Sequence, residues 1–434
     1  MGSSTTTTTT TTTTPPDLLL LPSSSSPSLV LTHPTPAELG RTWTLTHPHW
    51  GGALSPAAYL RREAYLMTVP LARRGGITHW ILTTTADAAA TPPRPVLSSC
   101  ESIRKGALVA TARPHPQVLR GTTHGIASVF TDPALRGRGY ARRMMRELGA
   151  RLRGWQAADD HDHDHDNAAL FSVLHSDVGR DFYARLGWRP MEAVHYAFPP
   201  AAPVAADEKK EPMDGPSKEE LDTSITAVPI RYHDLAELCA VDEQLLAQTL
   251  ARRAADPAVR PGTHLFALQP ELDAMLWHMM REDYMTTHIF GRTASVRGAV
   301  VALPPAPAPR RVWAVWARGY YGGLKRAEGN TLHVLRVAVE DEAARPTTPA
   351  ELAAALGAIL AVARAEAAAW HVQDVQLWNP EPAVRAAIAA CGVPYAVVER
   401  QTESIPSVMW YGQAEGGQGE PELEWVANEK YAWC

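Results

Sequence analysis

A short segment of the chain combines the residue types that bind a phosphate group, Arg136-Gly137-Arg138-Gly139-Tyr140-Ala141. Its two glycines let the backbone bend tightly and approach a ligand closely, which larger side chains would prevent. The free N–H groups at the start of a following helix would then point at the ligand and, together with the helix dipole, favour an anion such as phosphate. Further positive charge comes from Arg142, Arg143 and Arg146. We therefore expect a phosphorylated ligand at this segment.

The pattern differs from two common nucleotide-binding loops. The GxxxxGK[ST] pattern of a Walker loop is absent, and so are the glycine spacing and the downstream acidic residue of the GxGxxG dinucleotide fingerprint. The segment joins an extended run at Gly125–Thr131 to a helix predicted over Gly139–Arg153. That helix is indicated by apolar residues at every fourth position, namely Tyr140, Met144, Leu148 and Leu152.

The elements around this segment predict a mixed α/β domain in the first half of the chain. A helical pattern at Pro56–Ala72 comes first, and a short helix at Val178–Leu186 ends at Gly187, a suitable helix stop. The other expected extended runs are Ile77–Thr85, Val96–Ile103, Ala168–His175 and Met191–Phe198.

The second half repeats the same order of elements and is predicted to be a variant of the same fold. Its expected helices are Asp234–Arg253, Glu271–His288, Pro349–Trp370 and Glu381–Cys391, and its expected strands are Ser295–Leu303, Arg311–Arg318, Thr331–Val339, Asp374–Trp378 and a strand pair at Tyr395–Trp410. Where a phosphate loop would stand, the chain has no glycine but carries Glu340, Asp341 and Glu342, which would repel a pyrophosphate. We expect this half to be non-catalytic and to close or stabilise the first.

Changes in composition divide the chain into five parts. Residues 1–41, rich in Thr, Ser and Pro, are expected to be a disordered tail, and residues 200–223, rich in Pro, Ala, Glu and Lys, a linker. The two α/β domains then occupy residues 42–199 and 224–412, and residues 413–434 form a C-terminal tail. The alternating run Asp160–Asp166 carries metal-ligand side chains, but its place between a helix and a strand favours a surface insertion, so we expect no metal.

Charge, hydropathy and cysteine content exclude several classes of protein. The formal net charge of -5 provides no general positive field for nucleic acid. The longest apolar stretch, near Ala353–Ala363, falls short of the roughly 20 residues that span a bilayer, so no membrane partner is expected. Four widely separated cysteines form no CxxC pair, and a reducing cytoplasm is the expected location. No feature of the sequence specifies an oligomeric state.

The phosphate segment also resembles a known family motif. Arg136-x-x-Gly139-x-Ala141 is similar to the [QR]-x-x-G-x-[GA] coenzyme A motif of the GCN5-related N-acetyltransferases (GNAT), and Phe182–Trp188, FYARLGW, resembles the FYxxLGF signature near the end of that fold. The whole chain resembles the fungal lysine N6-acetyltransferases of lysine catabolism in Ser98–Arg104, Ser176–Tyr183 and Glu424–Cys434. The resemblance implies a GNAT-type mixed sheet with flanking helices, followed by a degenerate GNAT-like domain.

The resemblance also implies acetyl-CoA as the acetyl donor and roles for single residues. The backbone of Val129, Phe130 and Thr131 would hold the acetyl carbonyl and the pantetheine arm, and the amides of Arg136–Ala141 would hold the pyrophosphate. Tyr183 would donate a proton to the departing thiolate, a role that a phenol with a pKa near 10 suits. Ser176 stands where many members have an asparagine that bonds the cofactor, which is a departure from the family pattern.

The implied acceptor is a small-molecule amine, the ε-amine of free L-lysine, which must lose a proton before it can attack. Candidate bases in the sequence are His124, Glu101, Asp177 and the terminal carboxylate of Cys434, and spacing does not separate them. Two alternatives remain open at this stage. The acceptor could be another amine, such as a polyamine, an aminoglycoside or a protein lysine, or the chain could be a coenzyme A-binding regulatory protein without turnover.

Overall fold

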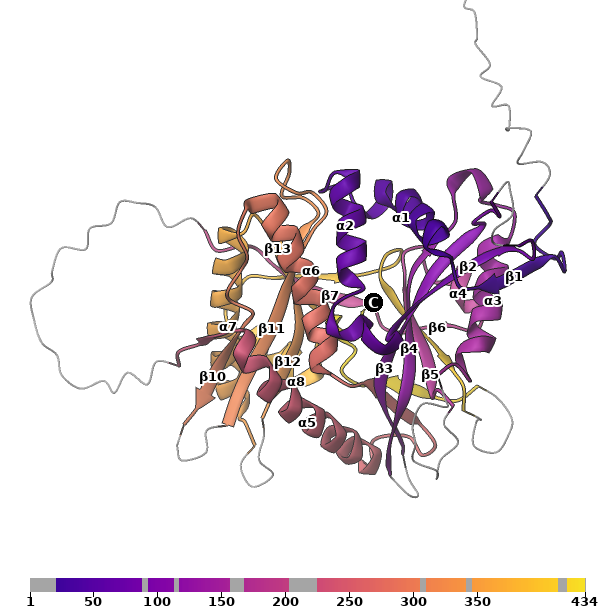
Figure 1. Ribbon diagram of the computed structural model, residues 1–434. Helices are drawn as coiled ribbons and strands as arrows, with labels where there is room; N and C mark the ends of the chain where they lie inside the picture. Colours follow the sequence, from indigo (N-terminus) through magenta and orange to yellow (C-terminus); the bar gives the residue numbers. More distant parts are fainter. Residues whose placement is uncertain are drawn as a thin grey trace, which may run out of the picture.

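Two mixed sheets, each flanked by helices, form the two halves of the molecule (Figure 1). The structure is a computed structural model and describes residues 21–87, 93–112, 117–156, 168–202, 225–304, 310–340, 346–412 and 420–433. Several sequence predictions therefore lie outside the described residues, namely those on the Thr run of the tail, the Asp160–Asp166 run, most of the linker, the start of the C-terminal tail, and Cys434.

The first sheet has the strand order β1-β2-β3-β4-β5-β15-β6, and β9 and β16 extend it beside β3. Its strands are β1 (Leu29–Thr32), β2 (Ile77–Thr84), β3 (Ser98–Thr111), β4 (Val118–Phe130), β5 (Phe171–Ser176), β6 (Arg189–Pro190), β9 (His264–Leu268), β15 (Ile405–Trp410) and β16 (Leu423–Trp425). The helices of this half are α1 (Pro36–Trp50), α2 (Pro56–Leu66), α3 (Tyr140–Leu152) and α4 (Asp181–Ala184), and the 3-10 turn η2 (Pro70–Gly75) follows α2.

Apolar side chains attach helices to both faces of the first sheet. On one face, the predicted stripe of α3 packs in a cluster that includes Trp80 and Cys100. On the other face, Leu66 of α2 packs with Ile77 and Ile103. Successive residues of a strand point to opposite faces, so Cys100 and Ile103 of β3 belong to different layers. The phosphate segment thus lies in the α3 layer, and α2 covers the opposite layer.

The second sheet has the order β14-β7-β13-β12-β11-β10-β8. Its strands are β7 (Val194–Phe198), β8 (Val228–Ile230), β10 (Gly298–Leu303), β11 (Arg310–Tyr320), β12 (Asn330–Val339), β13 (Asp374–Trp378) and β14 (Ala396–Glu399). The helices are α5 (Leu235–Ala255), α6 (Leu272–Phe290), α7 (Pro349–Ala369) and α8 (Pro382–Ala390). Helix α6 joins the halves, because Met275 and Met279 pack with Trp313 of β11 whereas Trp277 packs against the Ile103 layer.

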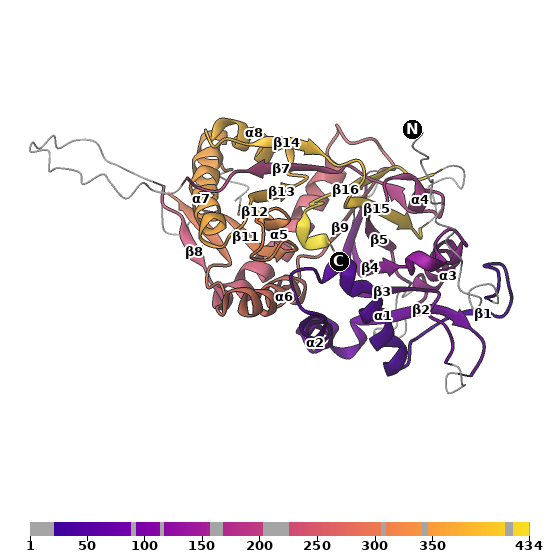
Figure 2. The ribbon, with the colours of Figure 1, turned by 90° about the horizontal axis from the view of Figure 1, so that it is seen from above.

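The two halves exchange strands. β7 follows the first half in the chain but pairs with β13 and β14, where Tyr196 lies opposite both Leu377 and Val397. β15 comes from the second half but lies between β5 and β6, with Val408 opposite Val173. Figure 2 shows β7 beside β13 and β15 beside β5. Each sheet is therefore completed by a strand from the other half, and separating the halves would break both ladders.

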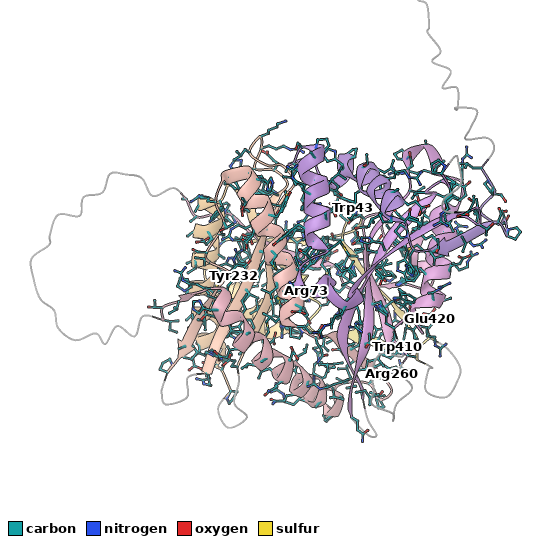
Figure 3. All side chains as sticks on the ribbon, in the orientation of Figure 1. Trp43, Arg73, Tyr232, Arg260, Trp410 and Glu420 are labelled. Carbon is teal, nitrogen blue, oxygen red and sulfur yellow. The ribbon has the colours of Figure 1, made fainter. Side chains whose placement is uncertain are left out.

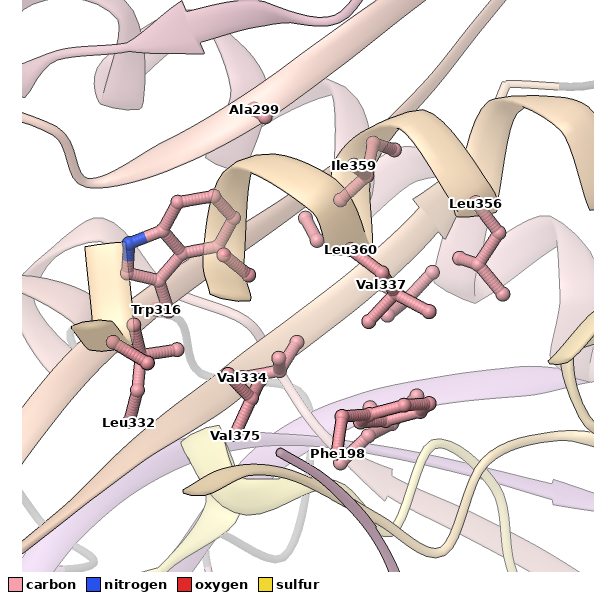
Figure 4. Close-up of a cluster of buried hydrophobic side chains, with 14 of the residues drawn as sticks. Phe198, Ala299, Trp316, Leu332, Val334, Val337, Leu356, Ile359, Leu360 and Val375 are labelled. Atoms are coloured by element: carbon pink, nitrogen blue, oxygen red, sulfur yellow. The ribbon is translucent and has the colours of Figure 1, made fainter. Parts of the chain in front are cut away.

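Helix α7 forms the core of the second half. Leu356, Ile359 and Leu360 pack against strands of the second sheet, including Val334 and Val375 (Figure 4). By length and by a mean hydropathy of 1.6 over its most apolar window, this helix could also cross a membrane, although the apolar stretch expected from the sequence was shorter. Its buried stripe on the sheet accounts for the same composition, because a helix that is apolar on most sides suits a protein core equally well.

The structure differs from the sequence expectations at both ends of the described chain. β1 and the first part of α1 lie within the expected tail, because Leu29 and Leu31 enter the α3-side core and Thr35 caps α1 with a capping box that includes Glu38. The expected strand pair at Tyr395–Trp410 is two strands that do not pair with each other. β14 joins the second sheet and β15 the first, because the turn between them crosses from one half to the other.

Candidate active site

The end of β4 carries a β-bulge beside an opening in the first sheet. Ser99 pairs with Phe130 and Glu101 with Ala127, so two residues of β4 lie opposite Cys100 alone. Ser128, inside the bulge, has a φ of 54°, a left-handed conformation that is uncommon for a residue other than glycine. The pairing of β4 with β5 ends at Ile126 and Leu174, although both strands continue, so within the described chain the end of β4 has no strand partner on that side.

The predicted phosphate segment lies directly after this opening. Gly137 and Gly139 adopt φ values of 79° and 85°, and no side chain caps the first turn of α3. A cavity of about 660 Å³ is lined by Thr131, Arg136, Gly137, Arg138, Gly139, Tyr140, Ala141, Arg142, Arg143 and Arg146, with Leu135, Phe182, Ser24 and Ser25. Uncapped amides, a helix N-terminus and several guanidinium groups therefore face one space, which fits the pyrophosphate of a coenzyme A thioester.

The first turn of α7 stands at the corresponding place in the second half. Unlike the first turn of α3, it is capped by side chains. Thr348 and Glu351 form a capping box, in which the Glu351 carboxylate accepts a hydrogen bond from the Thr348 amide at 2.8 Å. This backbone bond, together with an ion pair to Arg310, lowers the pKa of Glu351 to about 2. The helix start thus already holds its own anion, and a second anion there would be repelled.

Sequence reasoning missed the serines that complete the cavity of the first half. The Tyr140 hydroxyl donates to the Pro22 carbonyl at 2.6 Å, and the Arg143 guanidinium donates to the Ser24 carbonyl at 3.1 Å. These bonds hold residues 22–25 over the phosphate segment. A serine run has no periodicity, so nothing in the sequence indicated this contact.

Tyr183, the predicted proton donor, lies beneath the bulge in the α3 layer. Its side chain is 7% exposed and packs in the same cluster as Cys100, with its ring 6.4 Å from that of Trp188. Burial raises the pKa of the phenol above its ordinary value, and the nearby Cys100 and Asp177 raise it further. Within the described chain the hydroxyl has no hydrogen-bond partner. A protonated phenol is therefore held beside the opening at physiological pH.

Glu101 lies on the opposite face of β3 from Cys100. Its side chain is 17% exposed, and one carboxylate oxygen lies 3.6 Å from Nδ1 of His79. Figure 3 shows Trp43 of α1 above this part of the sheet, and the Trp43 ring lies 6.0 Å from that of His79. Burial raises the pKa of Glu101 to about 7, the charge of Glu63 adds to the rise, and a hydrogen bond with Ser128 of the bulge opposes it.

The structure separates Glu101 from the other described candidate bases. The His124 ring is fully buried, its Nε2 lies 3.2 Å from the Trp155 carbonyl, and burial lowers its pKa to about 4. The exposed Asp177 carboxylate accepts a hydrogen bond from the Ser404 amide at 2.9 Å. Glu101 alone of these three borders the bulge, with Tyr183 on the other face of the sheet.

Ser176 stands where many GNAT members have an asparagine, and its hydroxyl forms hydrogen bonds within its own turn. It donates to the Gly179 carbonyl at 2.7 Å and accepts from the Val178 amide at 3.2 Å. The local turn thus satisfies this side chain. The backbone of Val129 and Phe130 lies at the opening, but neither residue lines the cavity, and the Phe130 carbonyl accepts a hydrogen bond from Ser98 at 2.9 Å.

Comparisons with known proteins identify the family. A family model described as the LYC1 GNAT-like C-terminal domain matches residues 213–434, just over half of the chain. The chain belongs to this GNAT family. A second model, the acetyltransferase (GNAT) family, matches residues 71–188, so the GNAT relationship extends to both halves. The predicted fold class, a GNAT-type mixed sheet followed by a second GNAT-like domain, is confirmed.

Individual relatives are distant. The GNAT chain is 27% identical over 175 residues to a protein of Yarrowia lipolytica named lysine acetyltransferase, and the match spans 38% of this chain and 41% of that relative. Among solved structures, a probable N-acyltransferase of Enterococcus faecalis has a TM-score of 0.46 at 12% identity over 88% of this chain and 71% of that one. An N-myristoyltransferase of Saccharomyces cerevisiae has a TM-score of 0.45 at 7% identity over 91% and 82%.

Replacing Gly139 with alanine is expected to raise KM for acetyl-CoA about tenfold, because a left-handed backbone costs an L-residue roughly 1–2 kcal/mol. The new Cβ would also lie 2.7 Å from the Ser24 hydroxyl. Initial rates at varied acetyl-CoA measure the change. Gly154→Ala, at a glycine with no neighbour within 4 Å and no left-handed φ, is the matched control and should leave KM unchanged. An equal shift in both variants would contradict a role for the Gly139 turn.

Proposed function

We propose that this protein is an acetyl-CoA-dependent N-acetyltransferase that moves an acetyl group directly to the ε-amine of free L-lysine. One observation carries the proposal. The uncapped, arginine-lined start of α3 adjoins an opened sheet edge that is flanked by a carboxylate of raised pKa and a buried phenol. This arrangement supports binding of a phosphorylated thioester and transfer of protons on both sides of the reacting carbon.

Glu101 acts as the general base in this proposal. A lysine ammonium has a pKa near 10.4 and no lone pair, so it must lose a proton before it can form a bond to carbon. A carboxylate with a pKa of about 7 is largely ionised at pH 8 and is a stronger base than an ordinary glutamate. The His79 ring lies beside this carboxylate, with its Nδ1 3.6 Å from one carboxylate oxygen. Glu101 thus removes the proton from the incoming ammonium.

Tyr183 acts as the general acid. Acetyl-CoA supplies an activated acetyl thioester, and the amine nitrogen forms a bond to the acetyl carbon as the carbon–sulfur bond breaks. The Tyr183 hydroxyl gives its proton to the departing sulfur. The nitrogen of the new amide releases its surplus proton to solvent, and Tyr183 regains a proton from solvent. Because Tyr183 and Glu101 lie on opposite faces of β3, the two proton transfers take place on different sides of the bulge.

Free lysine as the acceptor is supported by the lysine acetyltransferase name of the Yarrowia relative, although that match spans less than half of either chain. A place in lysine breakdown follows from the same substrate. Location in the cytoplasm is part of the proposal, and it agrees with the free thiols of Cys100, Cys239 and Cys391.

Thiol release from acetyl-CoA tests the proposal. The purified full chain is supplied with free L-lysine, spermidine or a lysine-containing peptide in separate reactions, and the products are identified by mass. We expect release with L-lysine and formation of N6-acetyllysine. Release with spermidine or peptide alone would identify that amine as the acceptor, and acetyl transfer from acetyl-CoA would remain the proposed reaction. Tight coenzyme A binding without release in any reaction would overturn the enzymatic proposal in favour of a regulatory protein.

A further inference from the structure

A second cavity lies where the C-terminal turn η5 (Lys430–Ala432) meets helix α6 and strands β11 and β12. It has a volume of about 50 Å³, the size of a small polar group, and we call it the cationic pocket. The residues that line the cationic pocket include His278, Arg281, Tyr321, His333, Lys430 and Trp433. Figure 2 shows this turn, in yellow, between the two halves.

Positive charge gathers in and beside the cationic pocket. Lys105 of β3 is 4% exposed and donates to the carbonyls of Ala432 and Trp433, at 3.0 and 3.1 Å. The Lys430 ammonium lies between the rings of Trp378 and Trp433, 3.9 and 3.8 Å from their centroids. Arg281 donates to the Tyr321 hydroxyl at 3.3 Å.

Two of these cations have no acidic partner among the described residues. No carboxylate of the described residues lies within 4.0 Å of Lys105 or Arg281. Burial lowers the pKa of both His278 and His333, and nearby cations, among them Lys430 and Arg281, lower these pKa values further. Nδ1 of His333 is buried without a hydrogen-bond partner among the described residues. Because an uncompensated buried charge is costly, this arrangement favours an anion.

The cationic pocket lies on the acceptor side of the reacting centre. Glu101, Ile103 and Lys105 alternate onto one face of β3, and four residues of strand span about 13 Å. Trp277 of α6 packs against the Ile103 layer, and His278, the next residue, lines the pocket. Glu101, beside His79, and Lys105, bonded to the carbonyls of Ala432 and Trp433, mark the two ends of this interval.

A second connection runs through the turn after α1. The Tyr321 carbonyl lies 3.8 Å from the position that a Cβ on Gly52 would take. Two residues earlier, the Trp50 ring packs on Phe130 at the end of β4, with centroids 5.8 Å apart. The α1–α2 turn therefore contacts both the cationic pocket and the strand that carries the bulge.

We propose that the cationic pocket binds the carboxylate of the acceptor amino acid while its ε-amine lies at Glu101. The inference rests on the proposed function and adds the chemical group by which the acceptor is selected. In extended lysine, the ε-nitrogen and the carboxylate carbon are roughly 7 Å apart, which fits within the interval between the two groups. A polyamine, which has a cation at that distance, would be repelled.

Three acceptors of matched length test the subsite, namely L-lysine, 6-aminohexanoate, which keeps the carboxylate but lacks the α-amine, and n-pentylamine, which lacks both. Arg281→Met, in the full chain, is expected to raise KM for the two carboxylates about tenfold, the usual scale for loss of a charge-assisted hydrogen bond. KM for n-pentylamine should change less than about twofold. Lys430→Met is a second variant with the same expectation, and Lys325→Met, on the exposed loop after β11, is the control.

Each result decides between specific outcomes. A KM that rises for the carboxylates alone supports the subsite. An equal rise for n-pentylamine, or no rise for any acceptor, would overturn it while leaving lysine acetylation in place. If the wild-type protein releases no thiol with L-lysine, the proposal that lysine is the acceptor is overturned, and the carboxylate subsite is overturned with it. Melting temperatures of both variants exclude misfolding as the cause of a shift.

Discussion

Tyr183→Phe is expected to lower kcat about a hundredfold, the lower range for loss of a general acid, while leaving the affinity for acetyl-CoA unchanged. The phenylalanine ring fills the same space beside Trp188, so packing is preserved and only the proton is lost. Because burial holds the pKa of Tyr183 above its ordinary value, the wild-type phenol stays protonated, and its role should not weaken between pH 7 and 9. Steady-state kinetics with L-lysine and calorimetric titration with coenzyme A measure the two quantities.

Tyr411→Phe is the matched control for this variant. Tyr411 also packs against the α3-side cluster, but its hydroxyl donates to the Gly149 carbonyl at 3.0 Å and lies 2.8 Å from the Ser172 hydroxyl. Its loss should cost about 1 kcal/mol of stability, the usual value of one hydrogen bond, and leave kcat unchanged. If Tyr183→Phe kept kcat within a factor of about two, solvent rather than Tyr183 would protonate the sulfur.

Local features of the site could be predicted from the sequence, because short segments determine them. The turn at Gly137 and Gly139 needs only two residues able to take a positive φ, and the stripe that begins at Tyr140 orients α3. The lack of a phosphate site in the second half was predicted from Glu340, Asp341 and Glu342, whereas the structure shows a different local feature at the start of α7. Proline, threonine and glutamate at the start of α7 form a cap that fills the position of an anion.

Features that depend on distant contacts could not be predicted. β7 and β15 have ordinary strand sequences, and nothing within either strand specifies which of the two sheets it joins. Glu101 was one of several possible bases. Its raised pKa depends first on burial and then on the charge of Glu63, which α2 brings close from almost 40 positions away in the chain. The contact of Ser24 with the phosphate segment joins residues more than 100 positions apart.

Glu101→Gln is expected to lower kcat/KM for L-lysine about a hundredfold at pH 8 and to change its pH dependence. In the wild type Glu101 becomes ionised as pH rises through about 7, so the plot of kcat/KM against pH has a rising limb there. The variant lacks this limb and keeps only the slower rise that comes from the free amine itself. The ratio of wild-type to variant activity should therefore increase with pH through about 7 and level off above it. Rates measured from pH 5.5 to 9 at several lysine concentrations give this ratio.

Stability separates this chemical effect from unfolding. The pKa of Glu101 is raised from 4.5 to about 7, so the carboxyl contributes stability that is complete below pH 4.5 and is lost as pH rises through about 7. At pH 8 the neutral amide of the glutamine variant removes a partly buried charge, and Glu101→Gln should melt no lower than the wild type. Asp177→Asn, at an exposed carboxylate that accepts a hydrogen bond from the Ser404 amide, should keep the wild-type pH profile. A variant at Glu101 that retained the limb near pH 7 would assign the base to another group, whereas a limb lost without a lower melting temperature identifies the proton acceptor as Glu101.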